Sequence, residues 1–131
     1  IIWTKEVKDF DEDLKRGIVH YPGTAMPGEV GLSYISGHSS GYVWDRSPYK
    51  EVFAILGQVT DGTSFTITAT QNNGQTVRFN YVVIGRAEYA ANDQAQFVST
   101  AESQVALSTC WPVGTVDRRL VLYAQLTQTE R

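Results

Sequence analysis

The chain has 131 residues, a length typical of one domain with a single hydrophobic core. Its formal net charge of −3 and its pI near 5.3 exclude the basic surface that nucleic-acid-binding domains carry. Apolar residues make up 42% of the chain but occur in short stretches, none long enough for a membrane-spanning helix. We therefore expect one domain over residues 1–131 without a nucleic-acid partner.

Short elements separated by turns are expected in the first half of the chain. Residues 1–4 predict a strand, and residues 9–16 a surface helix that ends at Gly17. Residues 31–37 predict a further strand, with His38 just past its end. Residues 47–56 begin with a Ser-Pro pair and predict a short helix.

The second half of the chain carries the clearest strand signals. Residues 64–70 and 75–82 alternate strictly, and the Asn-Gly pair between them predicts a hairpin. Residues 85–103 are polar and irregular and predict a loop with one helical turn. Residues 104–109 and 119–126 predict two final strands. The abundance of Val, Ile, Thr, Tyr and Phe also favours a mostly β domain, as a barrel or sandwich.

Cys110 is the only cysteine of the chain and lies where a predicted strand meets Trp111-Pro112. Proline cannot donate to a sheet ladder, so the strand is expected to stop there. A side chain at a strand end can face a cleft, which would suit a nucleophile. A buried cysteine that acts as a small hydrophobic residue is the alternative.

His38 is the candidate partner for such a nucleophile. A thiol needs an adjacent base or cation to react well near neutral pH, and histidine can later protonate a leaving amine. Small residues flank His38 on both sides, which would leave its ring accessible. His20 competes for the role, but its bulky neighbours and the turn after it favour a structural histidine.

Arg119 opens the last predicted strand and could donate hydrogen bonds to the oxyanion of acyl transfer. Arg118 could serve instead, since two consecutive residues of a strand point to opposite faces and only one can reach a given site. A solvated charge at a strand edge is the alternative for either arginine.

These residues together resemble the sortases, a family of cysteine transpeptidases. The family signature is Thr-Leu-x-Thr-Cys followed by an arginine on the next strand, and residues 107–110 read Leu-Ser-Thr-Cys with Arg119 nine positions later. Gly37-His38-Ser39 resembles the histidine motif of the family, and residues 20–25 look like the segment that leads to it. Ala106 departs from the pattern, because many members have threonine there.

The resemblance implies an all-β fold, a closed eight-stranded sortase-like β-barrel with one or two short helices. It implies that Cys110 attacks the Thr–Gly bond of a sorting signal such as Leu-Pro-x-Thr-Gly and forms a thioacyl-enzyme. His38 would protonate the departing amine, and Arg119 would hold the substrate carbonyl or its oxyanion. Arg119 is preferred to Arg118 because the arginine of the family directly precedes the apolar run of its strand.

Substrate contacts are expected from Thr109, Trp111 and Trp44, which lie beside the predicted catalytic residues in sequence. Packing on the barrel rim is the alternative for both tryptophans. Residues 89–103 correspond to the loop that in sortases closes over the sorting signal. Some sortases bind calcium through loop carboxylates, but the acidic residues at 9–13 suit a solvated helix equally well. We expect no metal and no cofactor.

The expected partners are surface proteins that carry a sorting signal and an amine acceptor from peptidoglycan or a pilin. The resemblance also implies an extracytoplasmic protein that faces the cell wall, held by a membrane anchor that precedes Ile1 in the natural protein. Two rival functions use the same residues differently. A cysteine peptidase would pass the acyl group to water, and a non-enzymatic surface-binding barrel would keep Cys110 as a core residue.

Overall fold

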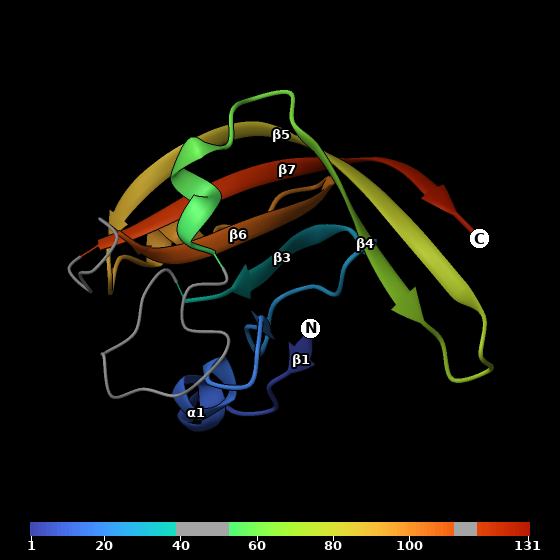
Figure 1. Ribbon diagram of the computed structural model, residues 1–131, viewed down its shortest axis with the longest axis horizontal. Coiled ribbons are helices and arrows are strands. Elements are labelled where there is room, and N and C mark those ends of the chain that lie inside the picture. The colour runs from blue at the N-terminus through green and yellow to red at the C-terminus, as the bar shows by residue number, and fades with distance from the viewer. Residues whose placement is uncertain (39–52, 112–117) are drawn as a thin grey trace.

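One curved β-sheet dominates the structure (Figure 1). The computed structural model of the protein describes residues 1–38, 53–111 and 118–131. Within these residues seven strands pair in the order β1-β2-β3-β6-β7-β5-β4. The sheet curls into an open half-barrel, and the β4–β5 arm extends away from the other strands (Figure 1).

The described strands form a mixed sheet. They are β1 (Ile2–Trp3), β2 (Val19–His20), β3 (Gly31–Ser36), β4 (Ser64–Thr70), β5 (Thr76–Ala90), β6 (Ser103–Trp111) and β7 (Arg118–Glu130). The pairs β1–β2 and β3–β6 are parallel, and the other neighbours are antiparallel. The mostly β fold is therefore confirmed. The described sheet has seven strands with β1 and β4 at its edges, so an eighth strand and closure of the barrel stay predictions.

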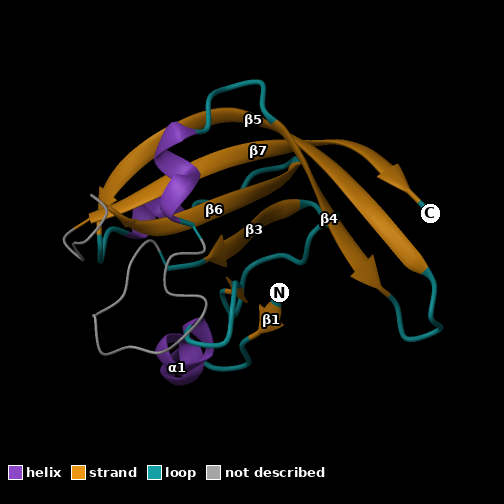
Figure 2. Ribbon diagram, viewed as in Figure 1, coloured by secondary structure: helices purple, strands orange, loops and turns teal. Residues whose placement is uncertain are grey.

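The helices of the described residues are few and short (Figure 2). They are η1 (Val7–Asp9), α1 (Phe10–Leu14), η2 (Ala54–Gln58) and η3 (Gln94–Phe97), where η marks a 3-10 helix. The helix predicted over residues 9–16 is present as η1 and α1. The expected start of the next helix, at residues 47–48, lies outside the described residues, and its predicted end forms η2.

The predicted hairpin is confirmed at β4 and β5, but β5 continues well beyond its expected end. Gly74 adopts a φ of 84° in the turn, a value that suits glycine in the Asn-Gly pair. The loop expected from residue 85 begins only after Ala90, because β5 pairs with β7 as far as Ala90↔Arg118. This pairing satisfies the backbone of a polar segment whose sequence alone does not predict a strand.

The two faces of the sheet carry separate hydrophobic clusters. On one face, Leu120 and Leu122 of β7 pack with Leu56 of η2. On the other face, Leu32, Tyr34, Ala106 and Val121 are buried. Partly buried aromatic side chains that pack against this second cluster are Tyr21, Tyr89, Phe97 and Tyr123. We call this second side of the sheet the aromatic face.

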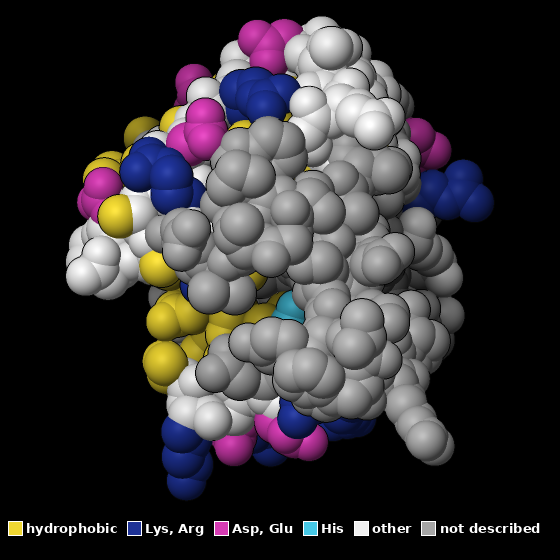
Figure 3. All heavy atoms as spheres, turned by 60° about the vertical axis from the view of Figure 1, so that its left-hand side comes forward, with side chains coloured by type: hydrophobic (Ala, Val, Ile, Leu, Met, Phe, Trp, Pro, Cys, Tyr) yellow, Lys and Arg dark blue, Asp and Glu magenta, His cyan; other side chains and the backbone are white. Residues whose placement is uncertain are grey.

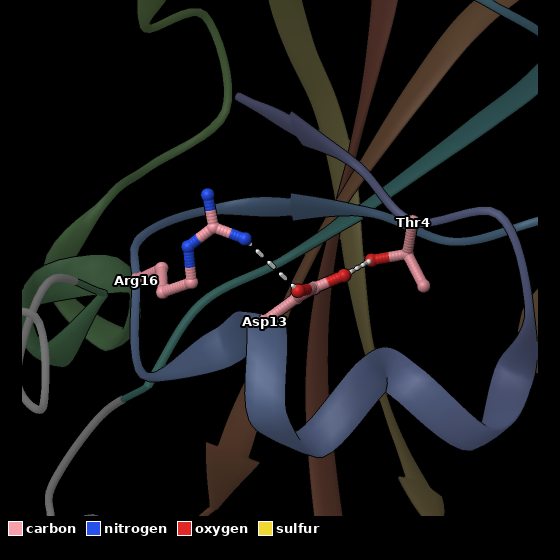
Figure 4. A network of polar contacts seen from close by, with 3 residues as sticks. All are labelled: Thr4, Asp13 and Arg16. Carbon is pink, nitrogen blue, oxygen red and sulfur yellow. Dashed lines mark hydrogen bonds and ion pairs between the residues drawn. The ribbon is translucent and has the colours of Figure 1, made fainter.

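The N-terminal segment is held to helix α1 by a small polar network (Figure 4). The Thr4 hydroxyl donates to Oδ2 of Asp13 at 2.7 Å, and Nη1 of Arg16 lies 3.5 Å from Oδ1 of the same carboxylate. Both oxygens of Asp13 therefore have partners within the chain.

None of the helices among the described residues has the length and apolar character needed to span a membrane.

Candidate active site

Cys110 is the penultimate residue of β6 and its side chain is half-buried. The strand was expected to end before the cysteine, but the sheet pairing continues through Trp111. Side chains alternate along a strand, so Cys110 lies on the same face as Ser108 and Ala106. Ala106 belongs to the aromatic cluster. Cys110 therefore lies on the aromatic face at the end of the sheet.

Arg119 of β7 is the direct register partner of Cys110. Residues opposite each other in an antiparallel pair point to the same side of the sheet, so the thiol and the guanidinium belong to one face. Arg119 is half-buried, whereas Arg118 is exposed and pairs with Trp111. Nη1 of Arg119 donates to the carbonyl of Arg118 at 3.1 Å. Of the two arginines, Arg119 is the one on the face of Cys110.

His38 lies just beyond β3, which runs parallel to β6. The last register pair of these strands is Ser36↔Ser108, so His38 and Cys110 each follow two residues later. The pairing continues past β3, because the Gly37 N–H donates to the Ser108 carbonyl at 3.1 Å. The His38 side chain is half-buried, and its carbonyl accepts from the Phe53 N–H at 2.7 Å. The backbone thus brings the segments of His38 and Cys110 side by side.

Thr109 joins these two segments through its side chain. It is 3% exposed, and its hydroxyl donates to the carbonyl of Gly37 at 2.8 Å. Thr109 therefore contacts the residue before His38. Its side chain lies on the face of β6 opposite to that of Cys110. Trp44 and the side chain of Trp111, the other expected substrate contacts, lie outside the described residues.

His20, the rival histidine, is buried at the end of strand β2. Its Nε2 lies 2.8 Å from the Ala25 carbonyl and 3.1 Å from the Thr24 hydroxyl. Trp3 packs against its ring edge-on, at 5.1 Å between centroids. These contacts occupy His20 within the N-terminal part of the chain.

Tyr34 is a buried polar residue close to the predicted site. Its ring is 2% exposed, and burial is the main cause that raises the pKa of Tyr34 to about 12. The positive charge of Arg119 acts in the opposite direction. Tyr34 is therefore neutral and able to donate a hydrogen bond at physiological pH.

Polar and apolar side chains lie next to one another at this end of the sheet (Figure 3). A histidine side chain reaches the surface there beside a group of hydrophobic side chains, with lysines, arginines and carboxylates further out (Figure 3). This end of the sheet carries the last residues of β6 and the first of β7. Apolar surface next to a titratable group is a usual setting for a substrate site.

Residues 91–102, the part of the expected loop 89–103 that lies between β5 and β6, cross the aromatic face. Phe97 of η3 packs against Tyr34 at 4.4 Å between ring centroids, while Val98 is 65% exposed. Ala90, which falls within the expected loop, belongs to β5 instead. Gln96 is 2% exposed and was not anticipated, because a glutamine in a polar segment carries no signal of burial.

The described residues contain no group of three or more His, Cys, Asp or Glu side chains that could hold a metal ion. The acidic residues near α1 include Asp13, whose carboxylate is engaged by Thr4 and Arg16. At the end of the sheet, the described strands bring together the segments that carry a thiol, an imidazole and a guanidinium.

The sortase domain family model matches residues 2–127 of the chain. The chain belongs to the sortase family. Among solved structures, sortase C1 of GBS pilus island 1 shares 26% sequence identity with this sortase and superposes with a TM-score of 0.73. The match covers 90% of this chain and 54% of that one, so this sortase spans about half the length of that relative.

Two further sortases have the same fold. A sortase E variant from Streptomyces avermitilis is 22% identical, covers 98% of this chain and 77% of its own, and has a TM-score of 0.73. Sortase A from Corynebacterium diphtheriae is 23% identical, covers 96% of this chain and 53% of its own, and has the same TM-score of 0.73. A comparison with curated proteins gives no match.

Proposed function

We propose that this chain is the catalytic domain of a cysteine transpeptidase, with Cys110, His38 and Arg119 as its catalytic residues. The observation that carries the proposal is the register pair Cys110↔Arg119 on one face of the sheet. The continued β3–β6 pairing, which leads to His38 on one strand and Cys110 on the other, supports it. Membership of the sortase family supports these roles.

In the first step, the thiolate sulfur of Cys110 attacks the carbonyl carbon of the scissile peptide bond. An S–C bond forms and the C–N bond breaks, which leaves a thioester on Cys110. His38, as the imidazolium, gives its proton to the departing amine nitrogen. A neutral incoming amine then attacks the thioester and passes a proton to His38 as the new C–N bond forms, and Cys110 leaves as a thiolate. Each step conserves the acyl group and needs no redox partner.

Arg119 would stabilise the negative charge that develops on the substrate carbonyl oxygen. Its guanidinium has several N–H donors in a fixed geometry. The contact of Arg119 with the Arg118 carbonyl holds the side chain near its own strand, so a substrate oxygen would replace or add to that contact. Removal of an oxyanion donor costs roughly 100- to 1,000-fold in kcat.

The rest of the function is proposed from the family alone. The acyl donor would be a surface protein with a sorting signal of the Leu-Pro-x-Thr-Gly kind, and the acceptor an amine of peptidoglycan or a pilin. The protein would act outside the cytoplasm and face the cell wall, held by an anchor that is not among these residues. Trp111 and Trp44 would flank the bound signal.

The proposal is tested by incubating the chain with a sorting-signal peptide in the presence and absence of triglycine. Transpeptidation predicts a ligated product that contains the triglycine, with less hydrolysis when the amine is added. Hydrolysis that is unaffected by triglycine would instead indicate a cysteine peptidase. Cys110→Ala should abolish both products, and a binding module would form neither product with any variant.

A further inference from the structure

Gln96 lies in a segment that is otherwise mostly exposed. Between residues 91 and 102, Gln96 is buried, Phe97 is partly buried and the rest are exposed. The end of the segment is tied to β3, because the Leu32 N–H donates to the Ser99 hydroxyl at 3.1 Å. The middle of the segment meets the sheet through Gln96 and Phe97.

Every polar atom of the Gln96 side chain has a partner. Its Nε2 donates to the carbonyls of Asp93 at 2.8 Å and Ala91 at 3.3 Å. These two contacts fix the amide orientation, so Oε1 faces the Tyr34 hydroxyl at 2.6 Å. The Tyr34 oxygen is also 2.7 Å from Oγ of Ser108. Since Tyr34 has one hydroxyl proton and gives it to Gln96, the Ser108 hydroxyl donates to Tyr34.

This network runs directly to the strand of the predicted nucleophile. Ser108 is 2% exposed and lies two residues before Cys110, on the same face of β6. The Gln96 carbonyl also accepts from the Tyr123 hydroxyl at 3.3 Å, and Tyr123 is the register partner of Ala106 on β7. Helix η3 is thus bonded to β3 and β7 on the face that holds Cys110 and Arg119.

We propose that Gln96 is a positioning residue that holds η3 as a fixed wall beside Cys110, against which the acyl-donor peptide binds. The proposal rests on the transpeptidase function proposed above and adds a residue to it. A peptide that lies along the aromatic face toward Cys110 would contact η3, because Phe97 packs against Tyr34 on that face. A wall that is already ordered spares the peptide the entropy cost of ordering it on binding.

The test uses Gln96→Ala with Gln94→Ala as the matched control. Gln94 is an exposed glutamine of the same helix. Its side-chain amide donates to the carbonyl of Asn92 at 3.5 Å, within its own segment and away from the sheet. We expect KM for the sorting-signal peptide to rise about tenfold in Gln96→Ala, with kcat and the rate of Cys110 alkylation by iodoacetamide within about twofold. Gln94→Ala should leave all three unchanged.

Tyr34→Phe serves as the second variant in case Gln96→Ala folds poorly. It keeps the ring that packs against Phe97 and removes only the hydroxyl that joins Gln96 to Ser108. It should raise KM in the same way. Amide hydrogen exchange over residues 91–102 provides a readout without substrate, and we expect it to be roughly tenfold faster in both variants.

The outcomes separate this inference from the proposed function. A wild-type chain that forms neither product overturns the transpeptidase, and exchange that is equal in Gln96→Ala and Gln94→Ala overturns the network itself. Faster exchange with an unchanged KM, or equal losses of kcat and of Cys110 alkylation, would show that Gln96 is only structural. Faster exchange with a selective rise in KM supports the positioning role.

Discussion

Single residues on the aromatic face have different surroundings although they lie close together. Cys110 and Arg119 are half-buried at the end of the sheet, whereas Ser108 and Tyr34 are almost fully buried behind them. A buried polar group must be hydrogen-bonded to avoid a large desolvation cost, and Tyr34 and Ser108 satisfy each other. The proposed reactive groups are therefore more exposed than the polar residues next to them on the same face.

The choice between the two arginines is a prediction at the residue scale. Arg119→Ala should lower kcat by roughly 100- to 1,000-fold because it removes the proposed oxyanion donor. Arg118→Ala should stay within about twofold of wild type, since that side chain is exposed and on the opposite face. Steady-state kinetics with a sorting-signal peptide measure both. Equal losses in the two variants would refute the assignment of Arg119.

Tyr34 predicts a dependence of stability on alkaline pH. Burial raises its pKa in the folded chain from 10.0 to about 12, so the unfolded chain loses this proton first as the pH rises. The unfolded state then binds fewer protons, and the free energy of unfolding falls between these two pH values. Urea unfolding at about pH 8 and about pH 11 measures the effect. Tyr34→Phe should show a smaller loss, and an identical loss would contradict the prediction.

At the scale of the elements, the β3–β6 junction is the connection on which the site depends. Thr109→Val removes the hydroxyl that donates to Gly37 and leaves a buried carbonyl with one partner fewer. We expect a loss of about 1–3 kcal/mol in the free energy of unfolding. Catalysis should also slow, because His38 follows Gly37 directly.

The matched control for Thr109→Val is Thr127→Val. The Thr127 hydroxyl also donates to a backbone carbonyl, that of Asn80 at 3.0 Å, but it is exposed and far along β7. Water can replace the lost bond there, so stability should change by less than about 0.5 kcal/mol. Urea denaturation and peptide kinetics measure both variants. A similar loss in each would mean that the junction has no special role.

Sequence patterns predicted the elements whose structure is determined locally. The hairpin of β4 and β5 follows from strict alternation around an Asn-Gly pair, and α1 from apolar spacing before Gly17. The extension of β5 to Ala90 was not predictable, because it depends on pairing with β7. The parallel pairing of β3 with β6 likewise joins segments far apart in sequence, so no local pattern predicts it.

The candidate site likewise has residues that sequence motifs predict and residues that only tertiary contacts reveal. Cys110, His38 and Arg119 belong to motifs that a sequence can show, and their strands lie together as the family resemblance implies. Tyr34 and Gln96 belong to no such motif, because they act through a contact between β3 and η3. A tyrosine in an apolar strand predicts only core packing, and the burial of a single glutamine is decided by tertiary structure.

On the scale of the whole molecule, the proposed site joins three segments that are far apart in sequence. His38 lies just beyond β3, Cys110 on β6 and Arg119 on β7. Residues 37 and 109 are 72 positions apart in sequence and yet share a hydrogen bond. The geometry of the site therefore requires the folded sheet, and conditions that unfold the sheet should abolish catalysis at the same midpoint.

The central claim is that Cys110 carries the acyl group, and intact-mass analysis of the chain after mixing with a sorting-signal peptide tests it most directly. The account predicts a mass increase equal to the acyl fragment, located on Cys110 by peptide mapping and released by triglycine. It also predicts no adduct in Cys110→Ala. Ligated product formed without any adduct at Cys110, or by the Cys110→Ala variant, would contradict the account.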